Sequence, residues 1–364
     1  MARRATARRR ARRRVARRRP RKRKSQPRWA SWPDERLLKL RLKDLKLPLR
    51  GTWLAGCLRE LNSELAEKGL RRVRPHGWIS SEWFSPDNTP GIAFPFYLAH
   101  PRLMRLERKM IIDVEGGTHA ECMRILRHEA GHVLQHSYAL HRHNRWRRLF
   151  GRSSTRYPSY YRPDPASRNF VQHLRLWYAQ SHPDEDFAET FAVWLTPRSN
   201  WRKRYESWPA LKKLQYVDEL MAEIAHQKPK LTRRREFEPL RSLGMTLGEH
   251  YQKKLHHYSV DAPRAYDRDL LRIFSNNPRH RHSPPAAAFI RHHQGDIRRL
   301  VSKWTGEYQL TLDQVLDEMI ERCRELKLRA VGHERQLRTD FTVLLTAKTV
   351  HSLYSPLRRQ WIAL

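Results

Sequence analysis

The chain has 364 residues, of which 74 are Lys or Arg and 37 are Asp or Glu, giving a formal net charge of +37. This length is enough for two domains, or one enlarged domain, with a buried core. No apolar run reaches the 18 or more residues that a membrane span needs. Three cysteines argue against a disulfide framework and favour a reducing compartment, so we expect a cytoplasmic protein.

The N-terminal segment is a polycation. Residues 1 to 28 contain 16 Lys or Arg and no acidic residue. Because so little apolar surface is present, residues 1–30 are predicted to form a disordered Arg-rich tail. Such a tail binds nucleic acid or another polyanion by releasing counterions. The alternative is that the chain's functional start lies downstream, near Trp29 or even Met104, and that the tail has no role.

Residues 31–230 contain elements predicted to form one α+β domain. Leucines at helical spacing predict a helix over residues 53–68, and strand-like segments follow near residues 72–80, 92–99 and 109–114. These segments predict a small antiparallel or mixed sheet. Pro95 places the second segment at a sheet edge or bulge, where an extended peptide could bind. A loop filled by aromatic side chains is an equally good interpretation.

A helix is predicted after Gly117, and it carries the motif His128-Glu129-Ala130-Gly131-His132. Thr118 and Glu121 have the spacing of a capping box. On a helix, residues four apart lie on one face, so His128 and His132 can bind one Zn²⁺. Glu129 is then placed to act as general base on a water activated by the metal. The alternative is two solvated histidines on a charged helix face.

A catalytic zinc site needs a third protein ligand. One class of such proteases takes it from a Gly and a His shortly after the motif, but Gln135 and Tyr138 occupy those positions here. A second predicted helix, which begins near Pro183, instead offers Glu185 as ligand. Glu189, one turn later, is predicted to accept a hydrogen bond from a ligand histidine. The alternative is that these acids only stabilise the helix N-terminus, as we expect for Asp184 and Asp186.

The segments 161–165 and 177–192 resemble bacterial proteins classed as putative zinc-binding metallopeptidases. More distantly, residues 185–191 are similar to the glutamate-ligand helix of lethal-factor-type toxin proteases, which are gluzincins. That resemblance implies a zincin-like fold, a metal-binding Glu185 and a supporting Glu189. It also implies that Tyr178, seven residues before Glu185, donates a hydrogen bond to the developing oxyanion. The Cys-rich zinc ribbon of many relatives is absent, because the chain has no C-x-x-C pair.

Residues 231–364 are predicted to be a mostly helical C-terminal region with a loop or linker near residues 275–288. The clearest helix covers residues 312–328, behind Thr311 as N-cap, and its apolar stripe is expected to be core. Four histidines, at positions 280, 282, 292 and 293, are expected to be solvated rather than to form a second metal site. His136 is expected to be a polar neighbour of the zinc site.

The sequence therefore predicts a zinc-dependent peptidase that holds one Zn²⁺ per chain and acts on a protein or peptide substrate. Glu129 and Tyr178 are its predicted catalytic residues. The alternative is a polyanion-binding or nucleic-acid-binding protein whose metal domain is structural or degenerate. No helix-turn-helix, zinc finger or aromatic RNA-binding motif supports sequence-specific recognition.

Overall fold

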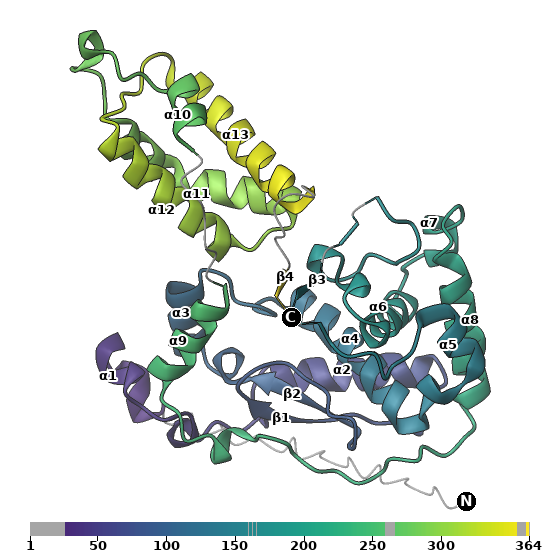
Figure 1. Ribbon diagram of the computed structural model, residues 1–364. Helices are drawn as coiled ribbons and strands as arrows, with labels where there is room; N and C mark the ends of the chain where they lie inside the picture. Colours follow the sequence, from purple (N-terminus) through teal and green to yellow (C-terminus); the bar gives the residue numbers. More distant parts are fainter. Residues whose placement is uncertain are drawn as a thin grey trace, which may run out of the picture.

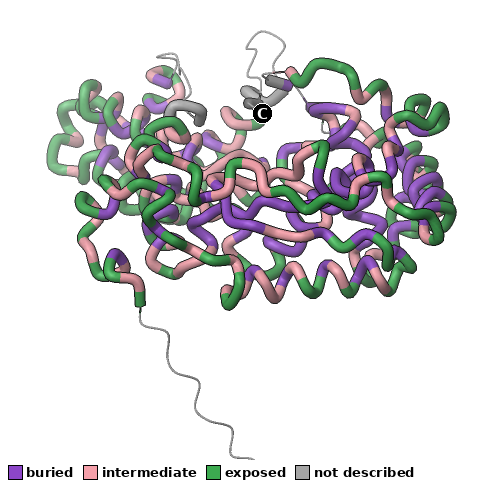
Figure 2. The backbone as a smooth tube through the Cα atoms, turned by 90° about the horizontal axis from the view of Figure 1, so that it is seen from below, coloured by how far each residue is buried: buried purple, intermediate pink, exposed green. Residues whose placement is uncertain are grey.

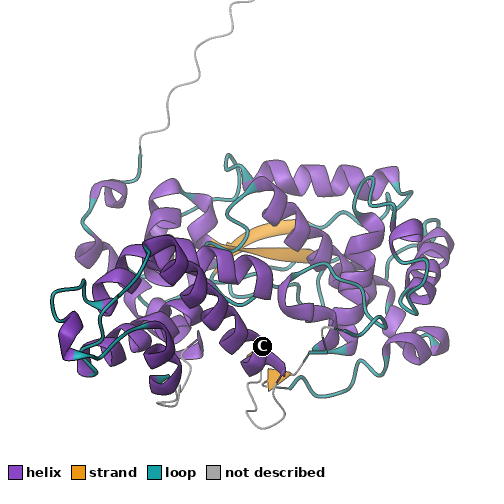
Figure 3. Cartoon of the chain, turned by 90° about the horizontal axis from the view of Figure 1, so that it is seen from above, coloured by secondary structure: helices purple, strands orange, loops and turns teal. Residues whose placement is uncertain are grey.

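The computed structural model describes residues 26–354 and 362–363, apart from residues 159, 162, 165 and 259–265. Residues 1–25 of the predicted tail therefore lie outside the described residues. The protein is α+β, with many helices around a very small sheet (Figure 3). None of the helices in the described part is long and apolar enough to cross a membrane.

The larger part of the molecule contains the first nine α-helices: α1 (Asp34–Leu38), α2 (Leu54–Glu67), α3 (Pro101–Ile111), α4 (His119–Tyr138), α5 (Asn144–Phe150), α6 (Pro183–Leu195), α7 (Trp201–Arg204), α8 (Leu211–Ile224) and α9 (Leu247–Tyr258). The C-terminal helices are α10 (Asp267–Ile273), α11 (Ala286–Thr305), α12 (Gln309–Glu325) and α13 (Glu334–Tyr354). The strands are β1 (His76–Ser80), β2 (Gly91–Pro95), β3 (Tyr160–Tyr161) and β4 (Ile362–Ala363). Short 3-10 helices are η1 (Arg28–Ser31), η2 (Leu42–Leu45), η3 (Phe96–Ala99), η4 (Leu140–Arg142), η5 (Arg175–Gln180), η6 (Leu240–Ser242) and η7 (Pro278–His280).

The sheet beside α4 is parallel, which corrects the antiparallel or mixed sheet expected from the sequence. β1 pairs with β2 in the register His76↔Gly91 to Ser80↔Pro95. A hairpin needs a short turn, whereas residues 81–90 are long enough to return the chain to the starting end of the sheet. On its other side, β2 meets an antiparallel bridge between Phe84 and Ala93. β2 is therefore an edge strand, as the sequence suggested, but this bridge covers part of its free side.

The strand expected over residues 109–114 is also wrong. This segment contains the last turn of α3, which begins with Pro101 at its first position and His100 as N-cap. Its buried side chains Leu103, Leu106, Glu107 and Ile111 have helical spacing. The helix ends at Ile111, and the C-cap residue Ile112 has a positive φ of 69°. The short apolar run at the helix end has the composition of a strand, but the spacing before it is helical.

Buried apolar side chains form two clusters. In Figure 2 the backbone of the buried residues is concentrated inside the molecule. The larger cluster includes side chains from Trp29 to Tyr251, among them those of α2, α4, α6 and α8. The smaller one is built by α10 to α13, which form a separate group in Figure 1. The two parts touch where Gln309 donates a hydrogen bond to Asp113 at 2.8 Å. The three cysteines are buried free thiols.

The C-terminal elements differ in detail from the prediction. α12 begins at Gln309, so Thr311 lies inside it and Tyr308 is the N-cap. The early start is consistent with Leu310, which packs in the larger cluster and fixes the first turn there. The predicted apolar stripe is buried as expected, with Leu312, Leu316, Met319, Ile320 and Cys323 in the smaller cluster. The predicted loop ends at Pro285, because residues 286–288 belong to α11.

Candidate metal centre

Helix α4 carries the two motif histidines on one face. Its N-terminus is fixed by Thr118, whose side chain accepts a hydrogen bond from the backbone N–H of Glu121 at 3.2 Å. Buried apolar residues on either side of the motif anchor the helix in the larger cluster. His128 and His132, four residues apart, are 3 % and 9 % exposed and face the same cleft. The capping and helical spacing expected for this segment are confirmed.

Helix α6 supplies the carboxylates that face these histidines. Pro183 occupies its first turn, and the His182 side chain accepts a hydrogen bond from the backbone N–H of Asp184 at 3.2 Å. Glu185 and Glu189 are one turn apart and both are buried. The two helices approach closely at Gly131, where an added Cβ would lie 2.7 Å from Cα of Ala188. The glycine inside the motif therefore lets the histidines reach the glutamates.

Three potential donor atoms converge between the helices. Oε2 of Glu185 lies 3.0 Å from Nε2 of His128 and 3.2 Å from Nε2 of His132. The two Nε2 atoms are 3.1 Å apart. In a tetrahedral zinc site with bonds of about 2.0–2.1 Å, neighbouring donor atoms are about 3.3 Å apart. The triangle of atoms is thus close to one face of such a tetrahedron, and these residues fit a zinc ion.

The protonation of His128 agrees with this interpretation. Its Nδ1 lies 2.8 Å from Oε1 of Glu189, whose other oxygen accepts a hydrogen bond from the backbone N–H of Leu174 at 2.7 Å. A carboxylate at that distance accepts a hydrogen bond from Nδ1–H, which leaves the Nε2 lone pair directed at the centre. Lone pairs from His128, His132 and Glu185 facing one point repel each other unless a cation lies between them. Glu189 thus lies where the sequence placed a supporting acid.

The electrostatics of the centre favour positive charge. Burial alone lowers the pKa of His128, but hydrogen bonds to Glu185 and Glu189 outweigh burial and raise that pKa well above its usual value. Burial similarly opposes ionisation of Glu185, yet the charge of His132 and hydrogen bonds from both histidines hold its pKa well below the usual range. The donor set therefore attracts protons, which a metal ion would replace on binding.

Glu129 lies beside the donors and lines the same cleft. Its side chain is mostly buried, and its Oε2 atom has no hydrogen-bond partner among the described residues. The backbone carbonyl of Glu129 accepts a hydrogen bond from the Ser85 hydroxyl at 3.2 Å. This contact ties the start of the motif to residues 82–87, which cover one side of the cleft.

Tyr178 lies beside His128, in η5. Its ring centre is 5.6 Å from that of His128, and it lines the cleft. Burial and the charges of Glu185 and Glu129 raise the pKa of Tyr178 well above its usual value, so the hydroxyl keeps its proton. The two preceding residues, Leu176 and Trp177, have left-handed backbone angles (φ +57° and +54°). Strain of this kind is common at functional sites.

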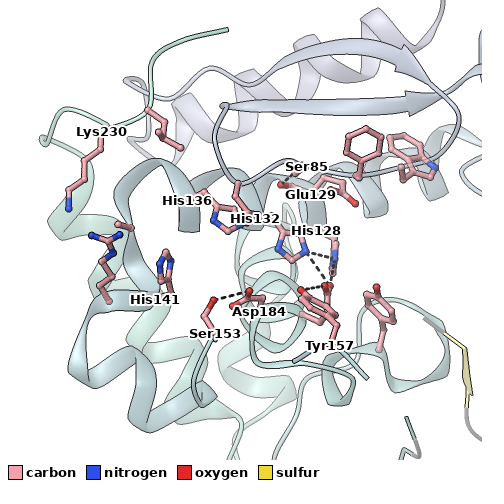
Figure 4. Close-up of a pocket in the computed structure, with 18 residues that line it drawn as sticks. Ser85, His128, Glu129, His132, His136, His141, Ser153, Tyr157, Asp184 and Lys230 are labelled. Atoms are coloured by element: carbon pink, nitrogen blue, oxygen red, sulfur yellow. Dashed lines mark hydrogen bonds and ion pairs between the residues drawn. The ribbon is translucent and has the colours of Figure 1, made fainter. Parts of the chain in front are cut away.

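The centre opens into a cleft of about 690 Å³, shown in Figure 4. A second cavity of about 340 Å³ adjoins it, and Trp83, His128, Glu129 and Tyr178 line both. Of the three candidate donors, His128 lies where the two cavities meet, whereas His132 and Glu185 line the larger cavity alone. His136 faces the larger cavity as a polar neighbour, with Nε2 3.3 Å from Oδ1 of Asp87. It is not part of the converging set.

The sequence analysis missed several residues of the cleft. Tyr157 donates a hydrogen bond to Oε1 of Glu185 at 2.9 Å, and Ser153 donates one to Oδ2 of Asp184 at the same distance. Both come from the connection between α5 and α6, which had no local pattern to distinguish functional residues from surface ones. Asp186, expected at the helix N-terminus only, forms a buried ion pair with Lys213 at 2.6 Å. That pair anchors α6 to α8.

A second cluster of possible ligands lies far from this cleft, in the C-terminal part. His292, His293 and Glu334 have ligand atoms within 4.8 Å of one another. His293 is only 6 % exposed, so the expectation of a solvated residue is wrong for it. Its Nε2 lies 3.1 Å from Oε1 of Glu334. This contact joins α11 to α13.

Residues 122–220 match the model of a family described as "Putative zinc-binding metallo-peptidase". The match begins in α4 and ends in α8, so it includes the histidine motif, Tyr178 and both glutamates of α6. No curated protein and no solved structure shows significant similarity to the chain. The family match supports the general class of zinc-binding peptidase and names no substrate or mechanism.

Proposed function

We propose that this protein is a zinc-dependent peptidase in which His128, His132 and Glu185 hold one Zn²⁺. The observation that carries the proposal is the convergence of their three donor atoms within 3.2 Å, beside the carboxylate of Glu129. The family match to residues 122–220 supports the same assignment. We further propose that the zinc site is of the gluzincin type, because its third ligand is a glutamate from a second helix.

A zinc ion in this centre supplies Lewis acidity and lowers the pKa of a water in the site to about 7. The chain's residues then have separate tasks. Glu129 accepts the proton of the attacking water and later passes it to the leaving amine. Glu189 keeps the Nδ1 proton on His128, so that Nε2 stays a neutral donor.

The cleft fits an extended peptide. The backbone carbonyl of Phe84 accepts a hydrogen bond from the backbone N–H of Ala93 at 2.9 Å, so this carbonyl faces the sheet. Neighbouring backbone groups in an extended segment point to opposite sides, so we infer that those of Trp83 and Ser85 are directed away from β2. Within the described chain they have no backbone partner. A substrate backbone that runs from one cavity to the other could pair with them.

We expect Tyr178→Phe to retain zinc and fold but to lose roughly 10²–10³-fold in kcat, as for removal of one oxyanion-hole donor. The phenol of Tyr178 donates to the negative oxygen that forms during attack, so turnover should fall more than substrate binding. Steady-state kinetics on one peptide substrate measures both constants. Unchanged kcat would assign Tyr178 to packing against the His128 ring.

A polyanion-binding role is the second candidate, and the net charge of +37 is the observation that favours it. Most of the tail lies outside the described residues, so binding of nucleic acid through it stays a prediction. Deleting residues 1–28 should lower the salt dependence of binding to mixed-sequence DNA and leave zinc binding intact. An unchanged salt dependence would remove the tail from this role.

The peptidase proposal itself is tested with a mixed peptide library. Zinc-loaded protein should cleave members of the library, a chelator should stop cleavage, and added zinc should restore it. Zinc that is bound in a ratio near one per chain, with no cleavage of any peptide, would favour the polyanion-binding alternative with a structural metal.

A further inference from the structure

A short segment of the connection between α5 and α6 holds the start of α6 at three points. The Ser153 hydroxyl donates to Oδ2 of Asp184 at 2.9 Å. The backbone carbonyl of Thr155 lies 2.8 Å from Nε2 of His182. The Tyr157 hydroxyl donates to Oε1 of Glu185 at 2.9 Å. We call residues 153–157 the strap, because alternate residues in it contact the first turn of the helix that carries Glu185.

The Tyr157 ring is fixed independently of its hydroxyl. It stacks on the His182 imidazole, with ring centres 3.7 Å apart and planes inclined by 15°. His182 is itself held in one tautomer, because its Nδ1 accepts from the backbone N–H of Asp184 while its Nε2 faces the Thr155 carbonyl. The phenol is therefore directed at Glu185 by the packing around it, although 46 % of the residue is exposed to the cleft.

The two oxygens of Glu185 have different surroundings. Oε2 faces the Nε2 atoms of His128 and His132 at 3.0 and 3.2 Å, whereas Oε1 accepts a hydrogen bond from the Tyr157 hydroxyl. A carboxylate that lacks such a donor can rotate and bind a metal through both oxygens.

We propose that Tyr157 is a positioning residue that makes Glu185 a metal ligand through Oε2 alone. This inference rests on the proposed zinc site and adds to it a reason why the fourth position stays open for water. Because the hydroxyl donates a hydrogen bond to Oε1, it prevents that oxygen from turning towards the metal position. Groups that hydrogen-bond to metal ligands in this way orient them, and their removal typically weakens metal binding about 10–100-fold.

Tyr157→Phe isolates the hydroxyl, because phenylalanine keeps the ring that stacks on His182. We expect its zinc affinity, measured by competition with a chelator, to fall about 10–100-fold. In the Co²⁺-substituted protein, the visible absorption reports coordination number, and the variant should shift from a four-coordinate towards a five-coordinate spectrum. Turnover should fall because the water position is partly taken, while KM for a peptide changes little.

Ser153→Ala is the matched control. It removes another contact of the strap with α6 and leaves the Tyr157 hydroxyl in place, so zinc affinity and the Co²⁺ spectrum should match the wild type. Equal losses in both variants would overturn the proposal, since loosening of the strap would then explain them. Wild-type zinc affinity and spectrum in Tyr157→Phe would overturn it too. A wild-type chain that binds no zinc would instead contradict the proposed metal site on which the inference rests.

Discussion

Glu129→Gln should retain zinc and lose about 10²–10⁴-fold in turnover, the range expected for removal of a general base. The substitution keeps the size of the side chain and removes only its ability to accept a proton. Glu129 is not among the converging donors, so the metal site should stay intact. Zinc content and hydrolysis of one peptide, measured on the same preparation, check both parts of this expectation.

Glu121→Gln provides a control, because it changes an acid on the same helix that borders only the smaller cavity. Its turnover should stay within a few-fold of the wild type. If Glu129→Gln were as active as the wild type, the proposed mechanism would be wrong, whatever the metal content. If it lost zinc as well as activity, Glu129 would belong to the metal site rather than act as base.

His128→Ala should abolish zinc binding and, with it, all hydrolysis. The variant removes one of three donors and also removes one partner from each of the buried carboxylates Glu185 and Glu189. Breaking a buried ion pair by removing one member typically costs about 3–5 kcal/mol, so we expect a lower free energy of unfolding as well. Metal analysis and denaturant unfolding of the variant measure the two effects separately.

His136→Ala is the control for this variant, since His136 lies one turn further along α4 and faces the same cleft without joining the donors. It should keep zinc and fold. A His128→Ala protein that still binds one zinc per chain at wild-type affinity would show that the converging atoms are not the metal site.

The two helices of the centre could be predicted because their signals are local. Thr118 and Glu121 mark the start of α4, and Pro183 marks the start of α6. The i, i+4 spacing of His128 and His132, and of Glu185 and Glu189, then fixes which side chains share a face. The interhelical distances were not predictable in the same way, because they depend on the close approach of Gly131 and Ala188.

Other parts of the site depend on contacts between distant segments, and no sequence pattern marks them. Tyr157 lies 28 positions before Glu185, in a connection without periodicity. The wall of the cleft near Trp83 follows from the parallel pairing of β1 and β2, which the length of residues 81–90 permits but does not require. The end of α3 was mistaken for a strand because three apolar residues at 110–112 gave no helical period of their own.

Identification of cleaved protein termini tests the central proposal most directly. Zinc-loaded wild-type protein and Glu129→Gln are incubated in parallel with the same mixture of cellular proteins, and new termini are identified by mass spectrometry. We predict a set of termini that appears only with the wild type and disappears when the metal is removed. Identical sets of termini from the two proteins would contradict a peptidase that uses Glu129 as its general base.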